Sequence, residues 1–119
     1  PVKGRLLADY GQVRAGGQLR WDGVLISAPA GSDVVAVRSG RVAYADWLPG
    51  LGQLLVIDHG GGWLSLYGHN QDLVHPVGSQ VAAGEVIAHV GDTGGQPRPA
   101  LYFEVRRNGK PQNPHQWVK

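Results

Sequence analysis

Glycine and proline recur so often in this sequence that no stretch of ten residues keeps a convincing helical period. The chain has 19 glycines and 8 prolines among its 119 residues, and these residues interrupt regular structure because glycine is too free and proline too constrained to continue it. Between them lie short runs rich in valine, isoleucine and leucine, which are typical of β-strands. The sequence therefore predicts an all-β domain, with strands at residues 20–26, 34–37, 40–47, 54–58, 63–68, 84–89 and 100–107.

One turn occurs twice. The sequence Pro-Ala-Gly-Ser-Asp-Val at residues 29–34 returns as Pro-Val-Gly-Ser-Gln-Val at 76–81, and each copy leads through alanine and glycine into a valine-rich strand. The second copy resembles the turn of biotinyl and lipoyl domains, but no lysine stands where those domains carry their cofactor. We therefore expect a duplicated half-motif without a carrier function.

Length and composition fit one globular domain over residues 1–119. At 42% hydrophobic, such a chain buries about two-thirds of its unfolded surface. A net charge of +2 is too small to indicate a nucleic-acid partner, and no apolar run approaches the ~20 residues of a membrane span. The opening Pro1-Val2-Lys3-Gly4 lacks the apolar segment of a signal peptide. We expect the C-terminal domain of a longer protein, with any targeting segment elsewhere.

Basic residues gather near the end of the chain and accompany one acid, Glu104. A solvated surface and an acidic partner both fit such a run. The basic residues are Arg98, Arg106, Arg107, Lys110 and Lys119.

Several longer strings follow one known pattern. They are Ala-Pro-Ala-Gly at 28–31, Val-Ile-Asp-His-Gly at 56–60, Leu-Tyr-Gly-His at 66–69, Phe-Glu-Val-Arg at 103–106 and Asn-Gly-Lys-Pro-Gln-Asn-Pro at 108–114. In these strings the chain resembles the LytM-type (lysostaphin-like) family of zinc endopeptidases. The resemblance implies antiparallel β-sheets with long loops around a central groove, built on a duplicated hybrid motif.

Apolar or aromatic residues stand where that family keeps its metal ligands. Active members carry His-x-Gly-x-Asp before the Ala-Pro-x-Gly turn and His-x-His before Phe-Glu-Val-Arg. This chain has Trp21, Leu25 and Tyr102 at the three ligand positions. A catalytic zinc needs three ligands from His, Asp, Glu or Cys, and no His-x-His or His-Glu-x-x-His spacing remains. We expect no metal, no other cofactor and no catalytic residue, and His69, which matches a catalytic position, is predicted to hydrogen-bond in the groove wall.

Strand alternation predicts which side chains face the groove. Because successive side chains point to opposite faces, Tyr102 and Arg106 share one face, while Leu101, Phe103 and Val105 share the face of the core. By the same alternation Trp21, Gly23 and Leu25 point together, and Val24 and Ile26 pack inside. The predicted binding groove has a floor of Trp21, Leu25 and Tyr102, a rim of Trp47 and Leu51, a wall at His69 and a charged group at Arg106. Apolar anchors with one arginine are typical of grooves that bind an amphipathic helix.

Within the family, the chain resembles EnvC-type cell-division activators through Leu-Arg-Trp-Asp-Gly at 19–23, Ser-Leu-Tyr-Gly at 65–68 and Leu-Tyr-Phe-Glu at 101–104. That resemblance implies a periplasmic domain that binds an N-acetylmuramoyl-L-alanine amidase and draws an autoinhibitory helix from its zinc site. Two alternatives stay open: a zinc peptidoglycan endopeptidase using substitute ligands such as Asp22 with His69, and a passive peptidoglycan-binding module.

Overall fold

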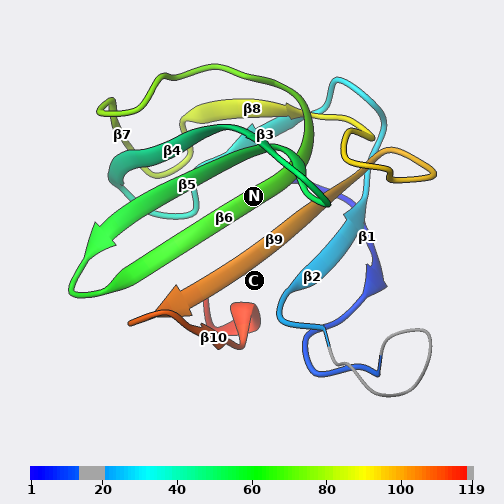
Figure 1. Ribbon diagram of the computed structural model, residues 1–119, viewed down its shortest axis with the longest axis horizontal. Helices are drawn as coiled ribbons and strands as arrows, with labels where there is room; N and C mark the ends of the chain where they lie inside the picture. Colours follow the sequence, from blue (N-terminus) through cyan, green and yellow to red (C-terminus); the bar gives the residue numbers. More distant parts are fainter. Residues whose placement is uncertain (14–20, 118–119) are drawn as a thin grey trace.

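The computed structural model describes residues 1–13 and 21–117, and within them ten strands and one short 3-10 helix (Figure 1). The strands are β1 (Arg5–Ala8), β2 (Val24–Ser27), β3 (Asp33–Val35), β4 (Gly40–Leu48), β5 (Gly52–Gly60), β6 (Trp63–Leu73), β7 (Gln80–Val81), β8 (Val86–Val90), β9 (Ala100–Arg107) and β10 (Lys110–Gln112), followed by the 3-10 helix η1 (Pro114–Gln116). The all-β prediction is confirmed.

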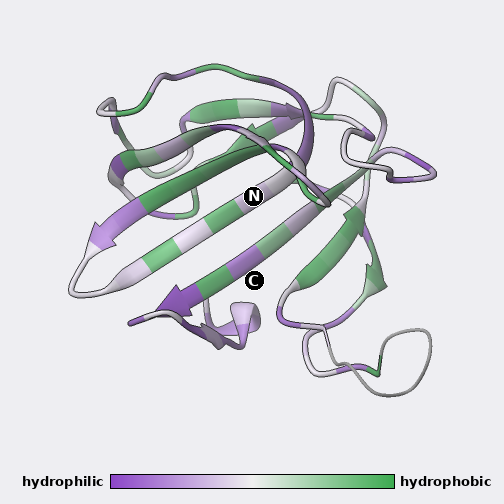
Figure 2. Ribbon diagram, viewed as in Figure 1, coloured by the Kyte–Doolittle hydropathy of each residue, from purple (hydrophilic) through white to green (hydrophobic). Residues whose placement is uncertain are grey.

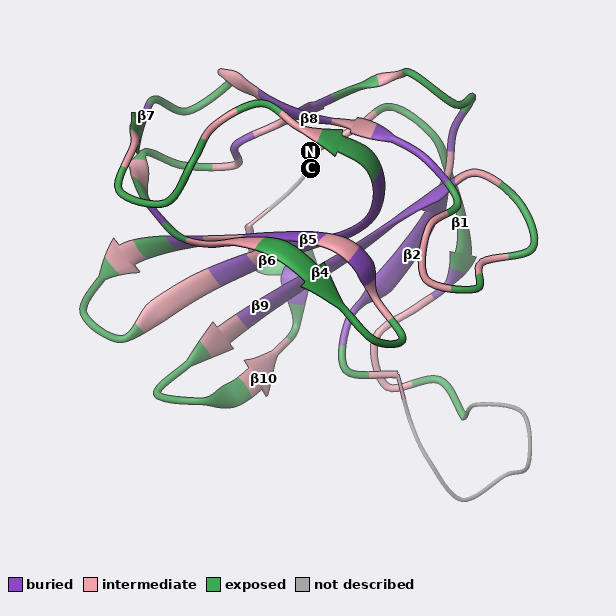
Figure 3. Cartoon of the chain, turned by 45° about the horizontal axis from the view of Figure 1, so that its top comes forward, coloured by how far each residue is buried: buried purple, intermediate pink, exposed green. Residues whose placement is uncertain are grey.

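All strand pairs are antiparallel, in the order β1-β2-β9-β6-β5-β4-β7. β10 extends the pairing of β9, and β8 pairs with both β3 and β6. The sheet bends back on itself, so that β8 lies over the layer of β4, β5, β6 and β9 (Figure 3). The main core fills the space between these layers.

The predicted strand at 100–107 coincides with β9, whereas the ends of several others differ. The prediction for 20–26 began too early: Arg20 lies outside the described residues, the backbone bends at Asp22 and Gly23, and β2 begins at Val24. Gly23 lies so close to the backbone of Phe103 that a Cβ would collide with it. Three short strands were not predicted, namely β1, β7 and β10. Strands of two to four residues leave too little alternation to detect.

β9 carries the alternation that its sequence predicts. Leu101, Phe103 and Val105 belong to the main core, while Ala100 and Tyr102 belong to a second, smaller cluster on the other face. Hydrophobic and hydrophilic residues accordingly follow one another along β9 (Figure 2). This strand therefore separates the core of the domain from a second apolar surface.

The repeated turn has the same geometry in both copies. Ser32 N donates to Pro29 O at 3.1 Å and Ser79 N to Pro76 O at 3.2 Å, with φ of 87° at Gly31 and 95° at Gly78. These are type II turns, whose third residue needs the positive φ that glycine tolerates. The serine hydroxyls strengthen both turns, because Ser32 Oγ and Ser79 Oγ donate to the same proline carbonyls at 2.6 and 2.8 Å.

Each turn pairs with a strand that belongs to the other copy. Gly31 N donates to Val90 O at 2.8 Å and Val90 N to Ser32 O at 2.9 Å, which ties the first turn to β8. The second turn repeats the arrangement on β4 through Val42, with the same two distances. The two half-motifs are therefore interlocked.

A chain of hydrogen bonds runs from His59 at the surface into the core. His59 Nδ1 lies 2.8 Å from Ser39 O, and because a carbonyl only accepts, Nδ1 carries the proton. His59 Nε2 then accepts from Ser65 Oγ at 2.7 Å, and Ser65 Oγ lies 2.8 Å from the buried Tyr67 hydroxyl. Burial raises the pKa of Tyr67 to about 12. Protonating His59 would turn Nε2 into a donor. One hydroxyl proton of Ser65 or Tyr67, both buried, would then have no acceptor within this series of hydrogen bonds.

We expect the domain to lose stability as the pH falls from 7.5 to 5. Burial holds the pKa of His59 and of His69 below their ordinary value of 6.5. The unfolded chain therefore binds these protons more readily, so the stabilisation is complete above pH 6.5 and is lost as the pH falls through the lowered pKa values. Melting curves across this range should show a falling midpoint, with a smaller fall in the double variant His59→Gln/His69→Gln. An identical slope in both proteins would contradict this account.

Candidate functional site

A pocket of about 470 Å³ opens on the face of β9 that carries Tyr102. Two loops and the segment at Trp21 enclose it, one loop joining β4 to β5 and the other following β8. Its lining consists of Trp21, Pro49, Gly50, Leu51, His69, Gly94, Gly95, Gln96, Tyr102 and Glu104. We call this hollow the β9 pocket.

An apolar cluster forms the base of the β9 pocket. Leu25 on β2 lies directly opposite Tyr102 on β9, and both side chains are buried together with Ala8 and Ala100. The half-buried Trp21 and Leu51 pack against this cluster, with the ring centroids of Trp21 and Tyr102 6.2 Å apart. Residues from four separate segments therefore build one surface, with the side-chain directions that strand alternation predicts.

A buried carboxylate links the two polar side chains of β9. Glu104 is 3% exposed, accepts from the Tyr102 hydroxyl at 2.6 Å and is ion-paired with Nε of Arg106. Burial, followed by the hydrogen bond to Glu104, raises the pKa of Tyr102, and the hydrogen bond to Glu104 raises that of Arg106. Tyr102 therefore stays a neutral phenol and Arg106 a cation across the working range of pH.

This network holds Tyr102 and Arg106, the two predicted contact residues of β9, in place. Tyr102 is only 7% exposed and uses its hydroxyl inside the protein. Arg106 has Nε engaged by Glu104, which leaves its two terminal nitrogens to contact a ligand. Alternation gives the face of a side chain and not how neighbouring side chains cover one another, and the predicted role of both residues in binding stays a prediction.

His69 is held in an unusual conformation at the pocket wall. Its φ is 64°, a region that non-glycine residues rarely adopt. Two bonds fix it, from His69 N to Leu51 O and between His69 Nδ1 and Thr93 O, each 2.7 Å long. Since the carbonyl of Thr93 only accepts, Nδ1 is protonated and Nε2 is left as an acceptor. Burial lowers the pKa of His69, which keeps the ring neutral.

Thr93 is a residue of the site that the sequence did not reveal. Besides holding His69, it donates from Oγ1 to Asn70 O at 2.6 Å and accepts from Gln53 N at 3.1 Å. Gly52 and Gly94 meet so closely that a Cβ on either would collide with the other loop. The two loops around the pocket are therefore joined to each other, and the neighbouring glycines were the only signal of this contact.

The predicted groove residues differ in where they lie relative to the β9 pocket. Trp21, Leu51, His69 and Tyr102 line the β9 pocket, Leu25 packs in the cluster at its base, and the partly exposed Arg106 is paired with the lining residue Glu104. Trp47 is 49% exposed near the end of β4 and is not among the residues that line the pocket, so its place on the rim stays a prediction.

The side chains at the metal positions do not fit a zinc ion. Leu25 offers no donor atom, Trp21 offers an N–H only, and the Tyr102 oxygen is committed to Glu104. Among residues 1–13 and 21–117 no group of three or more His, Cys, Asp or Glu side chains is arranged to hold a metal. Over the same residues, no helix is long and apolar enough to cross a membrane.

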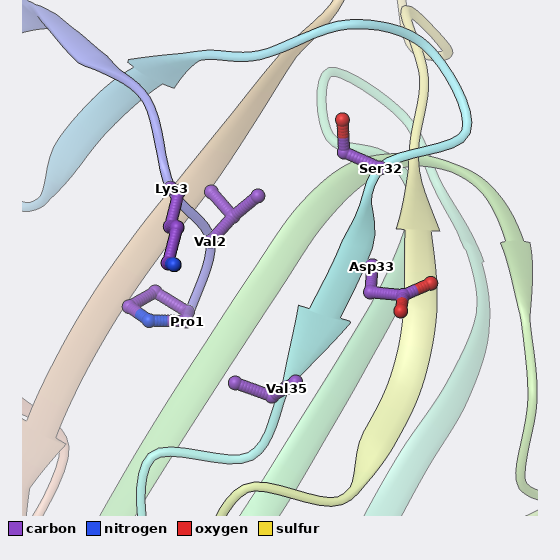
Figure 4. A pocket seen from close by; sticks show the side chains of 6 residues that line it. All are labelled: Pro1, Val2, Lys3, Ser32, Asp33 and Val35. Atoms are coloured by element: carbon purple, nitrogen blue, oxygen red, sulfur yellow. The ribbon is translucent and has the colours of Figure 1, made fainter.

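A different pair of hollows lies beside the first residues of the chain. One, of about 470 Å³, is lined by Pro1, Val2, Lys3, Ser32, Asp33 and Val35 (Figure 4). Its neighbour, of about 580 Å³, shares Pro1, Val2 and Val35. Both are mainly apolar, and Ser32 uses its hydroxyl in the turn described above. The β9 pocket is the candidate site because it alone of the three combines a buried carboxylate with an oriented histidine.

Comparison with known proteins places the chain in a family. Residues 19–114 match the pattern of peptidase family M23. The chain is 52% identical to the murein hydrolase activator EnvC of Escherichia coli over 118 residues, which are 99% of this chain and 28% of that protein. It is 34% identical to the murein hydrolase activator NlpD of the same organism over 119 residues, which are 99% of this chain and 30% of that protein.

A solved structure agrees over the whole fold. The mutant catalytic domain of the M23 protein EnpA from Enterococcus faecalis superposes with a TM-score of 0.85 at 28% identity, covering 98% of this chain and 92% of that one. The chain spans less than a third of the length of the two activators. Fold, sequence pattern and relatives agree, and the chain belongs to peptidase family M23.

Proposed function

We propose that this domain binds and activates a periplasmic N-acetylmuramoyl-L-alanine amidase during cell division and does not itself cut peptidoglycan. The observation that carries the proposal is the replacement of the metal site by Trp21, Leu25 and Tyr102, in a chain 52% identical to a murein hydrolase activator. A groove that is retained while its metal-ligand positions hold apolar or aromatic residues serves binding better than hydrolysis.

The β9 pocket supplies what a bound amphipathic helix requires. Trp21, Leu51 and the Tyr102 ring give it apolar walls, and the terminal nitrogens of Arg106 offer a contact for an acidic side chain at its edge. If the inhibitory helix of an amidase binds here, the amidase zinc site becomes open. Activation then needs only a higher affinity of the domain for the open state of the amidase.

We expect the purified domain to stimulate an amidase in trans on labelled cell wall without being consumed. An amidase from which the inhibitory helix has been deleted should be active without the domain, because nothing remains to displace. Release of label with each enzyme, with and without the domain, measures both effects. Continued dependence of the truncated enzyme on the domain would rule out displacement, and no stimulation of the intact enzyme would favour a passive peptidoglycan-binding module.

The alternative is a zinc endopeptidase with substitute ligands, favoured by the similarity to the EnpA catalytic domain and by the retained His69. In that case Asp22, exposed at the bend before β2, and His69 would bind the ion. Elemental analysis of chelator-free protein distinguishes the two functions. We expect no stoichiometric zinc and intact peptidoglycan, whereas one zinc per chain with activity lost in His69→Ala would establish the endopeptidase.

A further inference from the structure

Two arginines lie stacked on tryptophan rings at the end of β9 farthest from the loop that follows β8 (Figure 1). Arg38 Cζ lies 3.7 Å from the ring centroid of Trp117, and Arg107 Cζ lies 5.1 Å from that of Trp63. The two indole rings are neighbours, with centroids 5.1 Å apart. We call these four residues the Arg–Trp stack.

The Arg–Trp stack is assembled from four distant segments. Arg38 lies between β3 and β4, Trp63 begins β6, Arg107 ends β9 and Trp117 follows η1. Both arginines are exposed, whereas both tryptophans are partly buried against the main core. The rings are therefore fixed by the fold, and they hold the guanidinium groups at the surface.

The positive charge of the stack is not neutralised within the described part of the protein. No ion pair there involves Arg38 or Arg107, in contrast to Arg106 with its buried Glu104. Lys110 lies opposite Arg107 in the β9–β10 pair and adds a further exposed cation. The nearby acid, Asp58, lies opposite Arg41 and accepts from Gly60 N at 2.8 Å. His59, beside Trp117, stays neutral through its lowered pKa.

Stacking prepares a guanidinium group to bind an oxyanion. The contact with the ring uses the face of the guanidinium and leaves the N–H groups along its edge, whose fork matches two oxygens of one carboxylate. A packed arginine has also lost much of its side-chain freedom before a ligand arrives. If these arginines only stabilised the fold, their contacts with the rings would be sufficient, and N–H groups left available at the surface would not be needed. Two such groups side by side with a net positive charge suit a ligand that carries several carboxylates.

We propose that the Arg–Trp stack binds carboxylate groups of peptidoglycan stem peptides, at a site separate from the β9 pocket. The choice of peptidoglycan rests on the proposed function, because an activator of a wall hydrolase works beside a polymer that presents these carboxylates repeatedly. The domain then contacts the wall at one end of β9 and the amidase near the other. Lys119, which adds to the basic run in the sequence, lies outside the described residues.

The test is cosedimentation of the domain with purified peptidoglycan sacculi. The variant Arg38→Gln/Arg107→Gln should bind about tenfold more weakly, because both charge-assisted contacts are lost. The control variant Arg5→Gln/Arg98→Gln removes two exposed positive charges elsewhere and should bind like the wild type. Arg38→Lys/Arg107→Lys keeps the charge without the planar fork and should fall between them. Sacculi whose carboxylates have been converted to amides should not retain the wild type.

Several results would overturn this proposal. Equal binding by Arg38→Gln/Arg107→Gln and the wild type would do so, as would equal loss in the control variant or undiminished binding to amidated sacculi. Retention on vesicles of anionic phospholipid but not on sacculi would assign the site to a membrane. Melting curves show whether each variant is folded. Affinity for the amidase in solution should be unchanged in Arg38→Gln/Arg107→Gln, so that failure here is distinguishable from failure of the proposed amidase function.

Discussion

Tyr102→Ala is expected to abolish amidase activation. Truncating a central aromatic contact commonly costs ~2 kcal/mol, roughly thirtyfold in affinity. Because Tyr102 is buried against Leu25 and supplies a hydrogen bond to Glu104, the same change also removes about 3 kcal/mol of folding stability. Calorimetric titration with an amidase, at a temperature where the variant's melting curve shows it folded, measures the binding loss separately.

Tyr102→Phe is the matched control for that experiment. It keeps the ring in the pocket and removes the hydroxyl, which points to Glu104 inside the protein. Leaving one oxygen of Glu104 without this donor costs about 1–2 kcal/mol of stability, while affinity should change by less than about threefold. If folded Tyr102→Ala binds the amidase as tightly as the wild type, the partner surface is not the β9 pocket.

Phe103→Ala should nearly unfold the domain, although its neighbour on β9 belongs to the binding surface. Phe103 is fully buried, with its ring centroid 5.4 Å from that of Tyr67 in the main core. Removing a buried phenylalanine ring costs about 3–5 kcal/mol, a large part of the ~5–15 kcal/mol that stabilises a domain. A fall of roughly 10–20 °C in the thermal midpoint is expected.

Leu66→Ala is the comparison for Phe103→Ala. Leu66 lies on β6, the strand adjacent to β9, and is only partly buried. Its replacement by alanine should therefore lower the thermal midpoint clearly less than Phe103→Ala does. Comparable midpoints for the two variants would mean that the core does not lie on the Phe103 face.

The sequence contained enough information for the alternation of β9 and for the paired turns. Side chains alternate wherever a strand is regular, so the division between Phe103 in the core and Tyr102 on the opposite face follows from order alone. The turn at Gly31 and its copy at Gly78 are set by local chemistry, since both need a positive φ in the same place. Local rules of this kind need no knowledge of distant neighbours.

Contacts between distant segments could not be predicted in this way. Even within one strand, alternation placed Glu104 on the groove face but gave no sign that its neighbours Tyr102 and Arg106 would enclose it. Between distant segments, Thr93 holds His69 across 24 positions of sequence. The use of Tyr102 as a binding residue stays a prediction until its variants are measured.

The interlocked half-motifs mean that neither half of the chain encloses a complete core by itself. The turn ending at Ser32 needs β8, and the turn ending at Ser79 needs β4. The loop that carries Leu51 continues from β4 and the loop that carries Thr93 continues from β8, so the two joined loops that line the β9 pocket belong to different halves. Two fragments divided between Gly61 and Gly62 would have to associate before any pocket existed. The width of the pocket is therefore a property of the fit between the halves, and a ligand that spread its walls would have to strain that fit.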